Sequence, residues 1–292
     1  KDRYGVEAIC RILPIAASTY YRALDLVDNP EHRAKRALHD LHHAEQIKRI
    51  WKESLGRYGV RKVWQQLKRE GYVIARCTVA RLMQKLGIQG VWRGKNKQTT
   101  RSRDDQKRAD DLVKRNFNAD HPDQLWVADF TYIQTHSGWV YTAFIIDVFS
   151  RAIVGWKVST RMNTDMVLDA LEQALHDRGM PKNVIHHSDR GVQYLSIRYT
   201  NRLEAANLRA SVGTTGDSYD NALAETVNGL YKTEVIEYLK ADWQGLADVQ
   251  LATLNWVDWF NKKRVHSALG YVSPFEFEAM YYDKINPLGQ VA

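Results

Sequence analysis

The chain has 292 residues, 44% of them hydrophobic, so it is long enough to bury a large core, and we expect one big domain with a smaller one. Its 42 Lys and Arg residues outnumber its 34 Asp and Glu residues, and the net charge of +8 favours a polyanionic partner or an acidic surface. No apolar run reaches the roughly 18 residues that a membrane-spanning helix needs, so we expect a soluble protein. Cys10 and Cys77 indicate neither a disulfide framework nor a cysteine zinc site, which fits a reducing cytoplasm.

Residues 1–43 are expected to form an N-terminal helical segment. A helix over residues 6–13 ends at Pro14, and a second helix begins at Ser18 or Thr19. This pair is either a helix-turn-helix or a plain helical hairpin, because two short helices and a turn carry little specificity.

Residues 44–92 carry a stronger helix-turn-helix pattern. An amphipathic segment over residues 59–70 ends at Gly71, and a second helix over residues 78–86 ends at Gly87. Three cations lie on the second helix or just before it, where a recognition helix would meet DNA: Arg76, Arg81 and Lys85. Cations opposite an apolar stripe are also typical of any soluble helix, so this pattern alone leaves both interpretations open.

Residues 93–120 are predicted to be a basic linker, because they lack apolar periodicity. Their cations include Arg93, Lys95 and Lys97, which could lie along phosphates and release counterions. A linker that is merely solvated would have a similar composition.

Residues 121–282 are predicted to form a second, α/β domain, followed by a tail over residues 283–292. Short turns separate three strand-like runs, which indicates an antiparallel meander over residues 125–134, 139–147 and 152–159. The next expected elements are a helix, a strand, a helix and a strand, over residues 163–178, 183–188, 196–206 and 208–212. Three helices complete the domain: one from near Asn221, a long one over residues 246–260 and a short one from Ser273.

Two aspartates and one glutamate are the candidate catalytic residues. Asp129 lies in an apolar strand-like run, Asp189 ends another, and Glu225 shares a helix face with Asn228 or Gly229 and with Lys232. A charge in or beside a buried strand is costly unless it is paired or holds a metal ion. Carboxylates are ligands for hard cations such as Mg²⁺, and two such ions promote in-line phosphoryl displacement. The residues therefore indicate phosphodiester cutting or joining.

Other acids and two histidines compete for the same roles. Asp147 also lies in an apolar run, but we interpret it as structural, paired with Arg151 or a neighbouring hydroxyl. Capping of the following helix explains the acids at positions 217 and 220. The adjacent residues His186 and His187 point to opposite faces of a strand and cannot both easily reach one zinc ion, although one can line the site.

The three carboxylates and their surroundings resemble the DDE signature of retroviral integrases and insertion-sequence transposases. Thirty-five residues separate Asp189 from Glu225, and Lys232 follows the glutamate by seven. The surrounding motifs are WVADFTY at 126–132, DVFSR at 147–151, HSDRG at 187–191, YDNALAE at 219–225, and FN at 260–261 before Arg264 and His266. The chain is identified as a member of the IS-three family of transposases, second-frame (OrfB) type. It differs from retroviral integrases because it has no cysteine pair for their zinc module.

This resemblance implies an RNase H-like integrase catalytic core preceded by an all-α helix-turn-helix region. It implies that Asp129, Asp189 and Glu225 hold two Mg²⁺ ions, for which Mn²⁺ could substitute, and that one site nicks a transposon end and then joins the 3′-OH to target DNA. Lys232 would hold the DNA end, and Arg264 could also contact DNA. Expected partners are double-stranded DNA, further copies of the chain and an upstream first-frame (OrfA) segment, in the bacterial cytoplasm at the nucleoid. A nuclease that only cuts and a DNA-binding regulator with an inert core are the alternatives.

Overall fold

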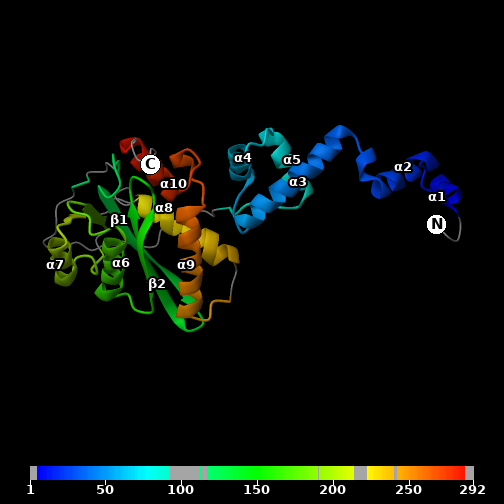
Figure 1. The fold of residues 1–292 in the computed structure, drawn as a ribbon. Helices are drawn as coiled ribbons and strands as arrows, with labels where there is room; N and C mark the ends of the chain where they lie inside the picture. The colour runs from blue at the N-terminus through cyan, green and yellow to red at the C-terminus, as the bar shows by residue number, and fades with distance from the viewer. Residues whose placement is uncertain are drawn as a thin grey trace. The chain divides into compact units, whose positions relative to one another are not determined.

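The structure is a computed structural model, and it describes residues 5–92, 112–113, 117–189, 191–213, 222–239 and 242–286. The chain divides into two compact units, Lys1–Gly90 and Val91–Ala292 (Figure 1). No helix in the described ranges is long and apolar enough to cross a membrane.

The described part of the N-terminal unit contains helices and no strands. Its elements are α1 (Val6–Ile12), α2 (Ala17–Asp28), η1 (Pro30–His32), α3 (Lys35–Glu53), α4 (Val60–Arg69) and α5 (Arg76–Lys85). Helix α3 runs through the domain boundary expected between residues 43 and 44, because the charged segment before that point continues the same helix that buries Ile47 and Ile50. This boundary therefore does not coincide with the end of an element.

Helices α3, α4 and α5 pack around one small core. Their buried apolar residues are Ile47, Ile50, Val63, Leu67, Val79, Leu82 and Met83. Gly71 and Gly87 follow the ends of α4 and α5 with φ values of +87° and +65°, which only glycine adopts without strain. The indole of Trp64 donates to the carbonyl of Ile74 at 2.8 Å and so fastens the connection before α5. These contacts give α5 a defined place on α3 and α4.

The C-terminal unit contains a five-stranded mixed sheet in the order β3-β2-β1-β4-β5. The strands are β1 (Leu125–Thr135), β2 (Gly138–Asp147), β3 (Ile153–Ser159), β4 (Ile185–Ser188) and β5 (Arg209–Val212). The first three strands form the predicted antiparallel meander, whereas β4 is parallel to β1 and β5 is parallel to β4. This is the strand order and direction of the RNase H-like fold.

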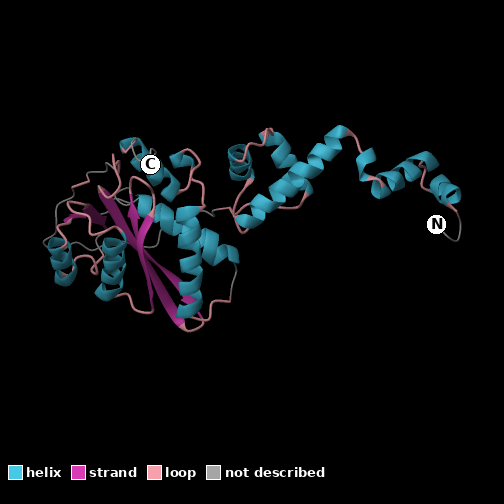
Figure 2. Ribbon diagram, viewed as in Figure 1, coloured by secondary structure: helices cyan, strands magenta, loops and turns pink. Residues whose placement is uncertain are grey.

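Helices cover both faces of this sheet (Figure 2). They are α6 (Thr164–Asp177), α7 (Ile197–Ala205), α8 (Ala222–Tyr231), η2 (Lys232–Glu237), α9 (Leu246–Lys262), η3 (Ser267–Leu269) and α10 (Pro274–Ile285). Helices α6 and α7 share a core with Trp126 and Ala143, while Phe144 on the opposite face contacts Tyr231 and Trp256. Element η2 is a π-helical continuation of α8. Both faces are therefore buried, as the apolar strands require.

Candidate active site

Two of the predicted carboxylates lie where strands β1 and β4 separate. The last paired residues of these parallel strands are Ala128 and Ser188, so Asp129 and Asp189 are the next residue on each strand. Both aspartates are half-buried. The carboxyl ends of adjacent parallel strands are common ligand sites, because the chains diverge there and leave a crevice.

Hydrogen bonds orient both aspartates. The Asp129 carboxylate accepts from the Phe130 backbone N–H at 2.8 Å and from the Asn228 side-chain Nδ2 at 2.9 Å. Asp189 Oδ1 accepts from the backbone N–H of Gly191 at 2.9 Å. A side chain at Gly191 would place its Cβ 3.0 Å from this same oxygen, so glycine allows the close turn.

The electrostatics of the pair disfavour two negative charges. The pKa of Asp129 is raised from 3.8 to about 7, mainly by burial and further by the charges of Asp189 and Glu225. The two hydrogen bonds from Phe130 and Asn228 lower this pKa, but by less. Burial also raises the pKa of Asp189, against the Gly191 N–H and the His187 ring, which lower it. A bound cation would relieve this cost, so the donor set fits a divalent metal ion.

Glu225 lies in the first turn of α8, the helix that packs on β1, and its side chain is exposed. Asn228, one turn further along this face, is the residue that reaches Asp129. Among the residues that the structure describes, no three His, Cys, Asp or Glu side chains lie close enough to hold one ion. The structure thus brings the two aspartates together and places Glu225 on the neighbouring helix, while a three-carboxylate ligand set stays a prediction.

Lys232 begins η2, and its Nζ lies 4.6 Å from the centroid of the Tyr132 ring on β1. It follows Glu225 by seven positions, which puts both side chains on one side of the helix. A cation therefore lies beside the strand that carries Asp129.

Arg264 does not have the surroundings of a DNA contact. Its side chain is 5% exposed, and Nη2 lies 2.6 Å from Oε1 of Glu234 in η2. Glu234 also accepts from the Trp256 indole at 3.1 Å. The guanidinium joins η2 to the segment that follows α9 through a buried ion pair, so the predicted DNA contact for Arg264 is wrong.

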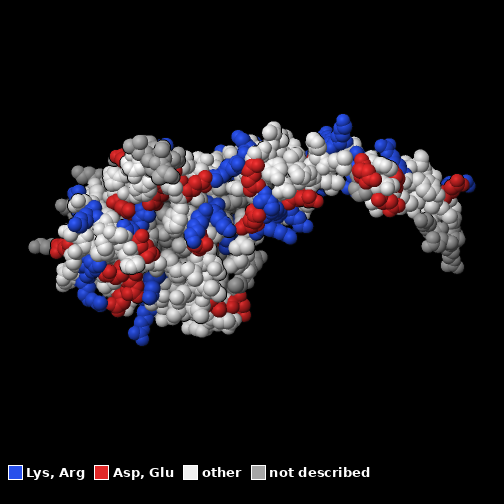
Figure 3. All heavy atoms as spheres, viewed as in Figure 1, with Lys and Arg blue, Asp and Glu red and all other residues white. Residues whose placement is uncertain are grey.

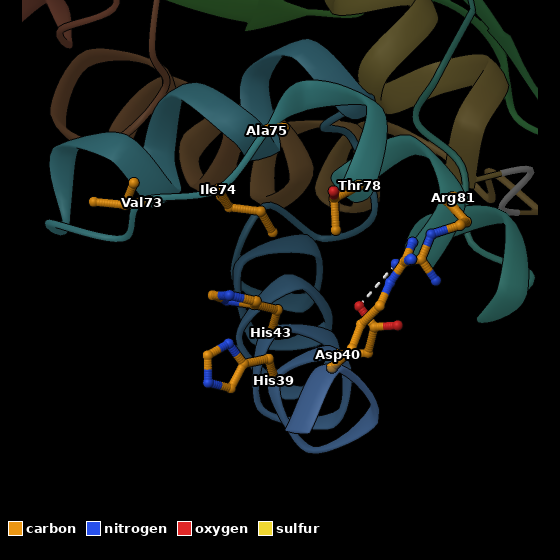
Figure 4. A pocket seen from close by; sticks show the side chains of 9 residues that line it. His39, Asp40, His43, Val73, Ile74, Ala75, Thr78 and Arg81 are labelled. Carbon is orange, nitrogen blue, oxygen red and sulfur yellow. Dashed lines mark hydrogen bonds and ion pairs between the residues drawn. The ribbon is translucent and has the colours of Figure 1, made fainter. Parts of the chain in front are cut away.

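The other predicted DNA-binding cations belong to the N-terminal unit or follow it. Arg76 and Lys85 are exposed on α5, whereas Arg81 pairs with Asp40 at 2.7 Å. Arg81 lines a cavity of about 280 Å³ that is also lined by Arg36, His39 and His43 (Figure 4). Arg93, Lys95 and Lys97 lie outside the described residues. Over the core unit, the face in Figure 3 shows acidic and basic side chains interspersed.

Asp147 is structural. It is fully buried, and one carboxylate oxygen accepts from both the backbone N–H and the hydroxyl of Ser150 at 2.7 and 2.8 Å. The other oxygen accepts from the Asp123 backbone N–H at 2.8 Å. Of the two partners expected for Asp147, the neighbouring hydroxyl is the one that donates to it. The capping acids expected at positions 217 and 220 lie outside the described residues.

The two adjacent histidines have separate partners. His186 Nε2 lies 3.1 Å from the Tyr199 hydroxyl, and burial lowers the pKa of His186 to about 4, so this ring is neutral. His187 Nδ1 lies 2.9 Å from the Ser211 hydroxyl. The two rings therefore have different hydrogen-bond partners, and His187 is the one that lowers the pKa of Asp189.

Two further residues belong to the site. The Asn228 contact could be anticipated only as a shared helix face with Glu225. Tyr194, buried next to both aspartates, gave no signal in the sequence: burial and the charges of Tyr199, Asp189 and Asp129 raise its pKa well above its ordinary value. Asn228 thus donates to one of the aspartates, and Tyr194 lies near enough to both for their charges to act on it.

Comparison with known proteins agrees with this geometry. Residues 119–218 and 206–274 match families described as Integrase core domain, and residues 39–96 match a family described as HTH-like domain. The chain is 53% identical over 285 residues to the transposase for insertion sequence element IS629 of Shigella sonnei, covering 98% of this chain and 95% of that protein. This chain belongs to the insertion-sequence transposases.

The transposase is also 31% identical over 277 residues to transposase InsF for insertion sequence IS3A of Escherichia coli K12, covering 94% of each chain. Its fold and family confirm the resemblance inferred from the motifs. The protein is therefore a DNA transposase with an integrase core, which is a polynucleotidyl transferase. Among solved structures, the HTLV-2 integrase catalytic core domain in complex with magnesium aligns with 55% of the transposase and 99% of that chain, at 18% identity and a TM-score of 0.45.

Proposed function

We propose that the transposase binds the terminal inverted repeats of its insertion sequence, nicks the ends and joins the freed 3′-OH to target DNA, with Asp129, Asp189 and Glu225 as the catalytic carboxylates. The observation that carries this proposal is the pair of aspartates at the separation of β1 and β4, with the pKa of Asp129 raised to about 7. Two acids of like charge in one crevice are suited to a shared cation rather than to a protein nucleophile.

Mg²⁺ is the cation that the three carboxylates would hold, at two ions per site, and Mn²⁺ is the expected substitute. When bound, such ions supply the charge that activates an attacking oxygen and stabilises the leaving oxygen of an in-line displacement. Asp129, held by Phe130 and Asn228, would present its carboxylate from β1, and Asp189 would do so from the turn after β4. Their negative charge repels Glu225 in the free protein, and neutralisation of that charge would favour its approach.

The DNA would be held at both units. Lys232 would contact the phosphates of the cleaved end beside Asp129, and the exposed cations of α5, Arg76 and Lys85, would contact the terminal repeat together with Arg81. Arg93, Lys95 and Lys97 would add phosphate contacts from the linker. Bringing two transposon ends together implies several copies of the chain, and an upstream first-frame segment would act with them at the bacterial nucleoid.

The test is a labelled-oligonucleotide assay with pre-nicked transposon ends in Mg²⁺, comparing wild type, Glu225→Gln and Glu204→Gln. Glu204 is an exposed glutamate on α7 of the same unit and serves as the matched control. Wild type and Glu204→Gln should join ends, whereas Glu225→Gln should bind DNA equally well and lose more than about a hundredfold in joining rate.

Each failure points to a different alternative. If Glu225→Gln joined ends as fast as wild type, Glu225 would not be a catalytic residue. Cutting without joining by wild type would favour a nuclease, and binding without either reaction would favour a regulator or a requirement for the first-frame segment.

A further inference from the structure

An exposed aromatic pair lies on the β1–β2 hairpin, further along β1 than the catalytic aspartate. The rings of Tyr132 and Trp139 are 5.3 Å apart between centroids at an interplanar angle of 81°. Tyr132 pairs with Tyr141 across the hairpin, so Trp139 is its diagonal neighbour on the same face. The side chains are 43% and 49% exposed, which leaves much of each ring surface to solvent.

A cation connects this pair to the site. Lys232 Nζ lies 4.6 Å from the centroid of the Tyr132 ring, and the helix that leads to Lys232 carries Asn228, which donates to Asp129. Tyr132 follows Asp129 by three residues on the same strand, a distance of about 10 Å, and this odd spacing points the two side chains to opposite faces of the sheet, so a DNA strand that reaches both passes around the edge of β1. Strand β4 pairs with β1 only as far as Ala128, so no described strand covers that edge of β1 beside Tyr132.

The hairpin that carries the pair is held in place. The backbone N–H groups of His136 and Ser137 at its tip donate to the carbonyls of Trp243 and Gln244 at 2.9 and 3.1 Å. The Ser137 hydroxyl also donates to the Gln244 carbonyl at 2.6 Å, and the His136 ring pairs with Asp242. A surface fixed in this way loses little conformational freedom when it binds a ligand.

We propose that Tyr132, Trp139 and Lys232 form a stacking platform for an unpaired base of the DNA strand that ends at Asp129 and Asp189. Aromatic rings bind unpaired bases through their faces, and an adjacent lysine suits the phosphate that accompanies the base. A base inside a duplex has both faces covered by its neighbours, so the platform selects a frayed or single-stranded end. This inference rests on the proposed function, because it assigns the position of the same DNA end.

A cross-strand aromatic pair also stabilises a hairpin, and the experiment separates the two roles. Full-length transposase is titrated in EDTA with blunt transposon-end duplexes and with duplexes that carry a short single-stranded overhang containing 2-aminopurine. The variants are Trp139→Leu, Trp139→Phe and, as a control, Phe275→Leu, which removes another partly exposed ring, 42% exposed, on α10.

Wild type should bind the overhang duplex about tenfold more tightly than the blunt duplex and quench 2-aminopurine fluorescence. Trp139→Leu should lose this preference and the quenching while retaining its affinity for the blunt duplex. Trp139→Phe should retain most of both, and Phe275→Leu should retain both fully.

Equal affinity of wild type for the two duplexes would overturn the platform. So would an equal loss of affinity for both duplexes in Trp139→Leu, because that result would assign the ring to hairpin stability. A transposase that binds the overhang duplex more tightly and quenches its 2-aminopurine, but joins no ends in Mg²⁺, would support the platform and count against strand transfer by this chain alone, so the two failures are distinct.

Discussion

Replacing Asp129 with Asn should stabilise the metal-free transposase near pH 8. The pKa of Asp129 is raised from 3.8 to about 7 by burial and by the nearby acids, so at pH 8 the folded chain carries a carboxylate charge that its surroundings disfavour. A folded-state pKa above the unfolded value means that stability falls as the pH rises from about 4 to about 7 and stays low above that range. Asparagine has no charge to lose and escapes this penalty.

The local hydrogen bonds permit the substitution. Asn228 now donates through Nδ2 to Asp129, and its own Oδ1 is buried without a partner among the described residues. Rotation of the Asn228 amide by half a turn would let Oδ1 accept from the amide that Asp129→Asn introduces, while the Phe130 N–H keeps an oxygen to donate to. The change therefore leaves the number of unpaired buried groups the same, because Asn228 Nδ2 moves to the position that Oδ1 now occupies without a partner.

The raised pKa sets the magnitude of the effect. A rise from 3.8 to about 7 corresponds to an upper bound of about 4 kcal/mol at high pH. Asp129 is only half-buried and shares its repulsion with Asp189, so we expect a gain of roughly 2 kcal/mol in the free energy of unfolding of the core unit.

Calorimetry in EDTA at pH 5 and pH 8 measures this gain, with Mg²⁺ added in a second series. Asp129→Asn should unfold at a higher temperature than wild type at pH 8, and the difference should be less than about half as large at pH 5, where the folded carboxyl is still protonated. Mg²⁺ should stabilise wild type at pH 8 and have little effect on the variant. A variant that is less stable than wild type at pH 8 without metal would refute the electrostatic reasoning.

Two further substitutions test the packing around the site. Arg264→Met leaves the buried carboxylate of Glu234 without its guanidinium partner and should lower the free energy of unfolding, measured by chemical denaturation, by about 3–5 kcal/mol. Adding Glu234→Gln should recover most of that loss, and equal instability of the single and double variants would contradict the role of the buried ion pair. Gly155→Ala would place a Cβ 2.2 Å from the backbone carbonyl oxygen of Ala170 and should lower the free energy of unfolding by about 1–3 kcal/mol. Gly59→Ala, with no atom within 4 Å of the added Cβ, should change the thermal unfolding temperature little. Similar behaviour of the two variants would show that α6 can move away from the added methyl group at little cost.

The sequence by itself determined the local elements and the candidate acids. Helix starts at Asn163, Ser196 and Ser273 were predicted within one or two residues, and each of these side chains caps its helix in the structure. The meander over β1, β2 and β3 followed from strand-like runs separated by short turns. These features depend on residues close together in the chain, so they can be predicted without knowledge of the fold.

Other features needed the tertiary structure. Asn228 and Asp129 are 99 positions apart in the chain, and only the packing of α8 on β1 brings them into contact. The π-helical turn that follows α8 has no local signal in the sequence, although it contains the buried Glu234. Packing between distant segments thus decides which polar groups of the site are hydrogen-bonded within the protein and which are available to bind a ligand.

Arg264 shows that the function of a residue can also depend on the tertiary structure. In the sequence it follows two lysines at the end of a helix and resembles a solvent-facing cation suited to DNA. In the fold it is buried against Glu234, which lies 30 positions earlier in the chain. Charge and spacing reveal which residues can do chemistry, but solvent exposure and partners depend on contacts between distant segments, and only the folded chain determines them.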